Sequence, residues 1–437
     1  RGIAWGAYHD PEVTMNRVDV IYKFPVRAHE AKTVKDYGED IVRELVINLI
    51  NSRFSELSQQ ENKPFMVGAS QYTNMFEPLD VLFLIAVGQP NEMQNTLKGL
   101  LTETQRIRQN GFTETEVARE KSEMERAMQK QYDERSKLQN ASYVKQYIDH
   151  FTKNEPIPPI ELKYQLVKSI LASTSVESVN AMAAKLLAGK DATIFISAPE
   201  SEKDHIPSAA QVESLFNTIY DSKLDAWVDN VKEEPLLSSR PVPGRVSASK
   251  TNKKLGTTEW ALSNGIKVIV KPTTFKEDQV LLSGFAPGGY SLLKDEAVPS
   301  AMLAGSVLSQ CGLGNFDAIQ LGKILAGKNA HVSASIEDYQ STISASSSSK
   351  LEELETMFQL IYLHFMSPRF EQKGYDNLMQ QLKTVFGGRE KDPDFLFQKK
   401  LIGALYGNTI RRFAPDMALL EKVSLDKIEK VYTERFA

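Results

Sequence analysis

Residues 262–270 read Leu-Ser-Asn-Gly-Ile-Lys-Val-Ile-Val, in which Asn and Gly separate two runs of strand-forming residues. An Asn-Gly pair supplies the positive φ angles that a two-residue turn needs, so this stretch predicts a β-hairpin. The preceding residues 201–256 contain clustered charges and a run of Ser, Pro and Gly at 238–244, which favours extended, solvated backbone. The sequence therefore predicts a linker that leads into the hairpin of a second domain.

On both sides of that linker, hydrophobic spacing predicts a similar order of strands and helices. The first half predicts strands at 17–24, 65–72, 79–87 and 191–197, and helices at 33–60, 90–110, 113–137 and onward to about 187. The second half predicts strands at 280–285, 330–335 and 342–346, and helices at 298–309, 316–325 and from 351 to the end. We therefore predict an α+β fold of two similar domains, each a mainly antiparallel sheet covered by helices.

The predicted domains are residues 1–200 and 257–437, with residues 201–256 as the linker between them. The second half reaches no counterpart of the closing strand at 191–197, and the chain does not begin with Met. We therefore expect both ends to have been cut from a longer protein, and the second domain to be truncated at its C-terminus.

Composition excludes several classes of protein. The chain has 437 residues, of which 41% are hydrophobic and 25% charged, unlike collagen-like, fibrous or wholly disordered chains. Its net charge of −4, with both signs mixed along the chain, gives no basic field of the kind that binds nucleic acid. No uninterrupted apolar run reaches the roughly 18 to 20 residues of a membrane span. The single cysteine, Cys311, excludes a disulfide framework within this chain.

Six short phrases carry a resemblance to a known family. They are Asn-Ser-Arg-Phe-Ser-Glu-Leu at 51–57, Gly-Phe-Thr-Glu-Thr-Glu at 111–116, the hairpin at 262–270, Ala-Pro-Gly-Gly-Tyr at 286–290, Asn-Ala-His-Val-Ser-Ala at 329–334 and Met-Ser-Pro-Arg-Phe at 366–370. In this order and spacing, the chain resembles the pitrilysin/insulinase-like zinc metallopeptidases over nearly its whole length. The resemblance implies repeated α+β domains that form two bowl-like halves around a peptide chamber. It identifies this chain with the second and third domains and their linker.

The resemblance also implies where zinc is held. The family binds zinc in its first domain through His-x-x-Glu-His and a distant Glu, and this chain contains no such motif. In the third-domain counterpart, residues 298–314 contain neither His nor Glu, and Gln359 matches the position of the distant Glu. We therefore predict no catalytic residue, no cofactor-binding residue and no metal ligand in this chain, with zinc bound by a domain further upstream in the parent enzyme.

Individual side chains offer alternatives that we consider weaker. His29 beside Glu30 is interpreted as a pair of surface polar residues in a loop, because adjacent residues on a regular element point apart. His331 falls on a predicted strand, and His364, on an apolar helix, is interpreted as packed and hydrogen-bonded. Cys311 lies at a helix end with no His in sequence reach, so we interpret it as a small packed residue and not as a nucleophile.

The function implied by the resemblance is that of a central, non-catalytic portion of a zinc metallopeptidase, forming chamber wall and linker for a peptide substrate. The alternative is a non-catalytic scaffold or partner subunit of the same fold, because fold does not fix function. Whether the parent is an enzyme stays open, and this chain alone is predicted to be inactive. The expected partners are the remaining domains of the parent chain and a peptide or unfolded-protein substrate, with no nucleic acid and no membrane span. The predicted location is the periplasm, with the cytoplasm as the alternative.

Overall fold

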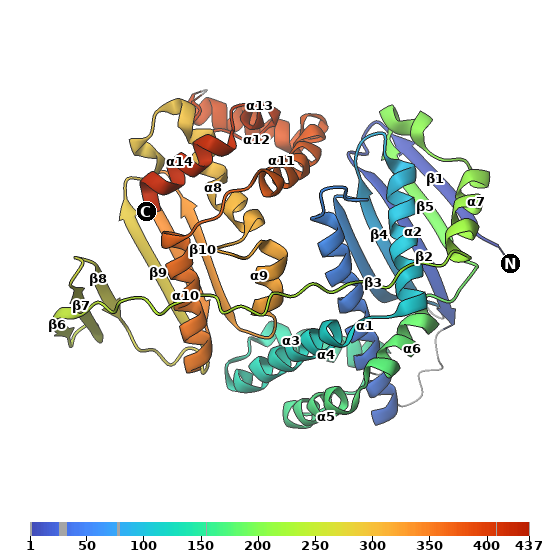
Figure 1. The fold of residues 1–437 in the computed structure, drawn as a ribbon, viewed down its shortest axis with the longest axis horizontal. Helices are drawn as coiled ribbons and strands as arrows, with labels where there is room; N and C mark the ends of the chain where they lie inside the picture. The colour runs from blue at the N-terminus through green and yellow to red at the C-terminus, as the bar shows by residue number, and fades with distance from the viewer. Residues whose placement is uncertain (1, 26–32, 77–78, 154, 408, 437) are drawn as a thin grey trace.

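The computed structural model describes residues 2–25, 33–76, 79–153, 155–407 and 409–436, which form two lobes joined by an extended strap (Figure 1). The strap comprises residues 221–245 and contains neither helix nor strand. Each lobe is built on a sheet covered by helices, so the predicted α+β class is confirmed.

The first lobe contains a five-stranded sheet in the order β1-β5-β2-β4-β3, in which β1 and β5 run parallel and the other neighbours antiparallel. Its strands are β1 (Ala4–Asp10), β2 (Asn16–Pro25), β3 (Val67–Phe76), β4 (Leu79–Gly88) and β5 (Thr193–Pro199). Its helices are α1 (Val34–Ser58), α2 (Met93–Asn110), α3 (Glu114–Asp133), α4 (Asn140–Lys153), α5 (Ile160–Ser173), α6 (Val176–Leu186) and α7 (Ala209–Tyr220). The sequence did not predict β1, because Gly, Ala, His and Asp favour strands weakly and pairing with β5 selects the conformation.

The core of the first lobe lies between one face of this sheet and the helices. Val20 on β2 faces that core with no exposed surface, and the register places it between Leu84 of β4 and Ile194 of β5. Helix α1 begins at a capping box formed by Thr33 and Asp36 and packs its apolar face, including Leu45, into the same cluster.

The second lobe contains a three-stranded antiparallel sheet in the order β10-β11-β9. Its strands are β9 (Val280–Pro287), β10 (Ala330–Ile336) and β11 (Gln340–Ser347). Its helices are α8 (Val298–Cys311), α9 (Ala318–Leu325), α10 (Leu351–Met366), α11 (Gln372–Gly387), α12 (Pro393–Tyr406), α13 (Met417–Leu420) and α14 (Leu425–Phe436). Within the described parts of the chain, no helix is long and apolar enough to cross a membrane.

The predicted hairpin forms, but it does not join the sheet of the second lobe. It consists of β7 (Thr257–Leu262) and β8 (Lys267–Val270), with Gly265 at φ +88° in the turn. With β6 (Val246–Asn252) it makes a separate sheet in the order β6-β7-β8, which lies beyond the second lobe at the left of Figure 1. None of the residues in these three strands is buried.

The segment 201–256, predicted as a solvated linker, is more structured than expected. Its helix α7 inserts Val212 and Phe216 into the core of the first lobe, where both are buried. Farther along, Leu236 of the strap is buried in the core of the second lobe. The expectation of solvated backbone is therefore wrong for residues 209–220, because apolar side chains at helical spacing outweigh the charged clusters around them.

Candidate functional site: a polar junction between the two lobes

The structure places two of the side chains that the sequence singled out, His364 and Cys311, in the core of the second lobe. His364 is buried in α10, its Nδ1 lies 2.8 Å from the carbonyl oxygen of Leu360, and burial lowers the pKa of its imidazole. Cys311 is buried at the end of α8, and burial raises the pKa of its thiol. His331 is exposed on β10. The interpretation of His364 as packed and hydrogen-bonded is confirmed, whereas His29 and Glu30 lie outside the described residues.

The donor atoms that zinc requires do not come together in the part of the chain that the structure describes. There, no group of three or more His, Cys, Asp or Glu side chains is placed to hold a metal ion. Helix α8 instead contributes buried apolar side chains such as Ala301 and Val307 to the core, and Gln359 lies half-buried on α10. Alkyl groups and a neutral amide do not fit a zinc site of the His and Glu kind.

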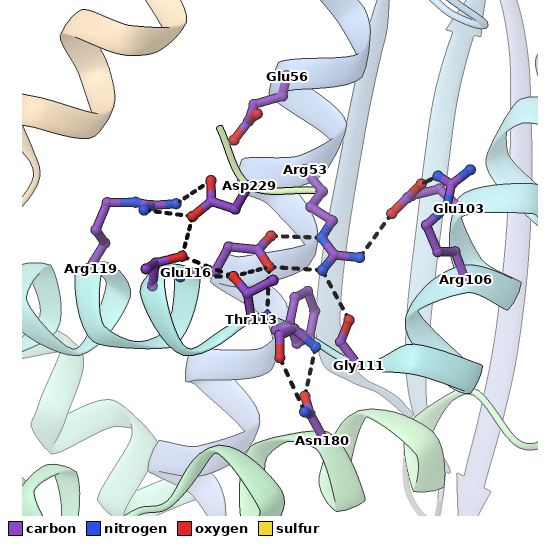
Figure 2. Close-up of polar contacts among 12 residues, drawn as sticks. Arg53, Glu56, Glu103, Arg106, Gly111, Thr113, Glu116, Arg119, Asn180 and Asp229 are labelled. Atoms are coloured by element: carbon purple, nitrogen blue, oxygen red, sulfur yellow. Dashed lines mark hydrogen bonds and ion pairs between the residues drawn. The ribbon is translucent and has the colours of Figure 1, made fainter. Parts of the chain in front are cut away.

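A cluster of buried charged side chains centres on Arg53 of α1, whose residue surface is 1% exposed. Its Nε and one terminal nitrogen donate to the two carboxylate oxygens of Glu116 on α3, at 2.7 and 2.8 Å. The other terminal nitrogen donates to Glu103 of α2 at 3.1 Å. Figure 2 shows the guanidinium between these two carboxylates. Burial opposes the positive charge, but the two carboxylates outweigh it and raise the pKa of Arg53.

The turn between α2 and α3 is shaped around this arginine. Gly111 ends α2 at φ +68°, and its carbonyl oxygen accepts a hydrogen bond of 2.9 Å from Arg53. Two residues later, Thr113 and Glu116 form the capping box of α3. Glu116 therefore caps its own helix and neutralises Arg53, while Asn180 of α6 binds the turn through the backbone of Phe112.

A second cluster ties the strap to both lobes through Asp229. Arg119 of α3 reaches both of its carboxylate oxygens, at 2.8 and 2.9 Å, and Thr115 donates to it as well. From the second lobe, Nζ of Lys323 on α9 lies 2.9 Å from the same carboxylate. Burial works against ionisation of Asp229, but the hydrogen bonds from Arg119, Thr115 and Lys323 outweigh it and lower its pKa to about 2.

Lys323 completes the connection between the lobes. Its side chain is 7% exposed, and Nζ also lies 2.8 Å from a carboxylate oxygen of Glu56 on α1. Glu56 and Lys323 line two hollows, with volumes of about 410 and 250 Å³. We call the set formed by Arg53, Glu56, Glu103, Glu116, Arg119, Asp229 and Lys323 the polar junction. It fixes the course of the strap and links α1, α2, α3 and α9. Each of its charged groups pairs with an opposite charge, and Arg106, outside the set, also pairs with Glu103.

Other polar contacts between the lobes accompany the junction. Arg126 of α3 lies 2.7 Å from Glu353 of α10 and 3.3 Å from Asp278, just before β9. After α1, Lys63 donates to Asn377 of α11 at 2.8 Å. The lobes are therefore held by charged and polar pairs distributed along α3 and the end of α1.

The carboxyl of one side chain beside the smaller hollow is governed by burial and by neighbouring carboxylates. Glu120 of α3 is 7% exposed and lines that hollow together with Glu123. Burial, with the nearby charges of Glu123 and Glu44, outweighs a hydrogen bond from Asn48 and raises the pKa of Glu120 to about 7. Between the ordinary pKa of 4.5 and this value, the folded protein binds a proton that the unfolded chain has released. Stability attributable to Glu120 therefore falls as the pH rises through that window.

Glu120→Gln is expected to raise the free energy of unfolding at about pH 8.5 by about 2 kcal/mol relative to the unsubstituted protein. The amide carries no charge to bury, and at about pH 4 both proteins hold a neutral group, so the difference should vanish there. Urea unfolding at a series of pH values measures the effect. Glu125→Gln, which changes an exposed carboxylate on the same helix, is the control and should show no such trend. A difference that does not vary with pH would contradict the raised pKa of Glu120.

Sequence reasoning found the phrases around this site but not their pairing. The phrases at 51–57 and 111–116 contain Arg53 and Glu116, and the capping box was visible in the spacing of Thr113 and Glu116. Nothing in the local sequence identifies Asp229 or Lys323 as junction residues, because their partners are supplied by distant segments. The apolar spacing of α9 predicts a helix, but it does not indicate that Lys323 is nearly buried.

No family model matches the chain. Among curated proteins, it is 27% identical over 411 residues to the "Zinc protease PQQL-like" protein of Arabidopsis thaliana, an alignment that covers 93% of this chain and 37% of that protein. The chain therefore spans well under half the length of this relative.

Solved structures share the fold. The ferredoxin protease FusC, in complex with Arabidopsis ferredoxin, superimposes with a TM-score of 0.61 at 17% identity, covering 99% of this chain and 48% of that one. Pitrilysin superimposes with a TM-score of 0.50 at 12% identity, covering 99% of this chain and 44% of that one. At these identities, the superpositions establish that the two-lobed arrangement is a known one.

Proposed function

Because the chain belongs to the pitrilysin/insulinase-like protease family, we propose that it is a central, non-catalytic portion of a zinc metallopeptidase. Its part is to form a section of the chamber wall and the connection between the two halves of the parent enzyme. Residues 1–200 and 257–437 are the two repeat domains of this proposal. In this proposal the connection between the two domains is the strap, and α7, within residues 201–256, packs with the first domain.

The observation that supports a non-catalytic role is the lack of zinc-binding side chains at the positions where the resemblance implies them. The alignment with a zinc protease extends over 93% of this chain, yet the α8 region holds no His or Glu, and Gln359 stands where the resemblance implies the distant Glu. These residues do not fit a zinc site, and they take part in no chemical step of the proposed reaction. The zinc and the water that it activates belong, in this proposal, to an upstream domain of the parent.

Enclosure is the contribution that this chain makes to peptide-bond hydrolysis. A peptide held between rigid walls loses much of its freedom before it meets the metal, which lowers the entropic part of the barrier. The polar junction suits that role, because ion pairs buried between α1, α3, the strap and α9 hold the two lobes in one relative orientation. The substrate in this proposal is a peptide or an unfolded protein.

The test measures zinc content and peptide cleavage for this chain and for the same chain extended upstream by one domain. We expect stoichiometric zinc and chelator-sensitive cleavage only in the extended protein. Far-UV circular dichroism and cooperative unfolding of both proteins serve as folding controls. Zinc and cleavage by this chain alone would overturn the non-catalytic assignment. Zinc in neither protein would favour a scaffold or partner subunit over a peptidase.

The periplasm is the compartment that we propose for the parent, and fractionation of cells that express the full-length protein tests it. Co-purification of the full-length protein with periplasmic markers is the expected result, and recovery with cytoplasmic markers would contradict it.

A further inference from the structure

Charge is distributed unevenly along the chain. Residues 240–276 contain eight Lys and Arg residues and a single acidic residue, Glu259, so this segment carries a net charge of +7. Because the whole chain carries −4, the remaining residues together carry −11. The nearly balanced composition of the whole chain conceals this contrast. A segment this basic on an otherwise acidic protein favours attachment, at that segment, to a negatively charged partner.

Folding gathers half of these basic side chains at one end of the β6-β7-β8 sheet. Lys253 and Lys254 lie in the turn that joins β6 to β7, and Lys250 lies near the end of β6. Lys271 directly follows β8, and the end of β8 pairs with the start of β7 beside the same turn. We call these four residues the lysine tip.

The positive charges of the lysine tip are exposed and not neutralised. All four side chains are exposed, and among the residues that the structure describes none of them forms an ion pair. The single carboxylate of the sheet, on Glu259, is taken by a lysine outside the tip, since Oε1 lies 3.1 Å from Nζ of Lys267. Four positive charges therefore face the solvent together.

An apolar side chain stands among these lysines. Leu255 follows Lys254 in the turn and is 58% exposed. Its backbone N–H donates to the side-chain oxygen of Asn252 at 3.2 Å, and Gly256 follows at φ +64°, so the turn has a defined conformation that displays the leucine. A leucine side chain is stabilised by leaving water for an apolar environment. The partner that fits best therefore offers negative charge at its surface and an apolar interior beneath it.

We propose that the lysine tip is a peripheral attachment site for an anionic lipid bilayer. The four ammonium groups lie among the phosphate headgroups, and Leu255 enters the boundary between the headgroups and the acyl chains. The sheet lies beyond the second lobe, at the edge of the molecule, where a flat surface can meet it (Figure 1). This inference is independent of the proposed function and holds for a peptidase or a scaffold.

The chemistry of the tip favours a bilayer over nucleic acid. Its cations are all Lys, which act as point charges, whereas Arg forms the paired hydrogen bonds that recognise phosphate geometry. The turn between β6 and β7 contains no aromatic side chain on which a base could stack. Four lysines with one leucine give weak, reversible association, in which each lysine strengthens binding to an anionic surface about fivefold.

Vesicle co-flotation of the full chain tests the attachment site. The vesicles contain phosphatidylcholine alone, or phosphatidylcholine with about 30% phosphatidylglycerol. We expect binding only to the vesicles with phosphatidylglycerol at about 50 mM salt, and loss of most of that binding at about 500 mM salt, because salt screens exposed charges. Lys253→Gln combined with Lys254→Gln should weaken binding about 25-fold. Leu255→Ser, which keeps every charge, should weaken it about tenfold.

The matched control combines Lys427→Gln with Lys430→Gln. It removes the same charge from exposed positions on α14, so it should bind like the unsubstituted chain. Circular dichroism checks that every variant is folded, as expected for substitutions at exposed positions.

Equal binding to the two kinds of vesicle, or binding to neither, would overturn the proposal. Equal weakening by the pair of substitutions in the tip and the pair on α14 would also overturn it. Unchanged binding by Leu255→Ser would contradict the choice of a bilayer as the partner. Release of the chain from vesicles by poly-glutamate or by duplex DNA, at the same concentration of negative charge, would identify an acidic polypeptide or a nucleic acid as the partner instead.

Discussion

Arg53→Ala is expected to lower the free energy of unfolding by about 3–5 kcal/mol, because it leaves buried carboxylates without their partner. The arginine binds Glu116 and Glu103, which are 6% and 1% exposed, and its side chain packs against the ring of Phe112. After substitution, Glu116 keeps only its capping hydrogen bonds, and Glu103 keeps Arg106. Urea unfolding at neutral pH, followed by circular dichroism, measures the loss.

Arg135→Ala provides the comparison for this substitution. Arg135 pairs with Glu161 at 3.3 Å, but both side chains are substantially exposed, so the change should cost less than about 1 kcal/mol. A loss for Arg53→Ala no larger than that for Arg135→Ala would show that Arg53 is not needed to compensate the buried carboxylates. If Arg53→Ala fails to fold, Arg53→Lys is the second variant. It keeps the positive charge but loses the paired guanidinium hydrogen bonds to Glu116, so it should retain part of the stability.

Gly111→Ala is expected to destabilise the protein by about 2–4 kcal/mol, through two effects that add at one position. At φ +68° a side chain is strained, and an ideal Cβ would lie 2.2 Å from Cγ of Asn180. Asn180 cannot withdraw freely, because it hydrogen-bonds both the N–H and the carbonyl oxygen of Phe112. The turn that presents the Gly111 carbonyl oxygen to Arg53 must therefore shift. Thermal and urea unfolding both report the loss.

Gly407→Ala separates the two effects. Gly407 ends α12 at φ +71°, close to the value at Gly111, but nothing lies within 4 Å of its ideal Cβ. This variant should show only the conformational strain, about 1–2 kcal/mol. Equal losses in the two variants would mean that Asn180 accommodates the methyl group, and that close packing is not what requires glycine at residue 111.

The sequence predicted that the two halves share an order of strands and helices, but it did not predict where the two halves differ. Paired strands between two helices recur as β3 and β4 in the first lobe and as β10 and β11 in the second, at the predicted places to within a few residues. The hairpin at 262–270 also forms as predicted. Its position apart from the β9 sheet was not foreseen, because strand propensity specifies a hairpin but not the sheet that it joins.

For the site, the sequence pointed to what the chain lacks more than to what it holds. The missing His-x-x-Glu-His motif is a matter of residue identity and needs no structure, so the prediction of no catalytic or metal-binding residue rests on the sequence and stays a prediction. The polar junction is different. Lys323 and Glu56 are 267 positions apart, and neither has a neighbour in sequence that indicates the pairing.

Local secondary structure depends on interactions between residues a few positions apart, so it can be predicted from the sequence alone. They account for the amphipathic helices, the capping box of Thr113 and Glu116, and the Asn-Gly turn. The burial of Arg53, the low pKa of Asp229 and the raised pKa of Glu120 depend instead on which distant segments exclude water from a charge. The packing of α1, α2 and α3 brings together the segments around Arg53 and Glu120, and the packing of the strap between the two lobes brings together those around Asp229.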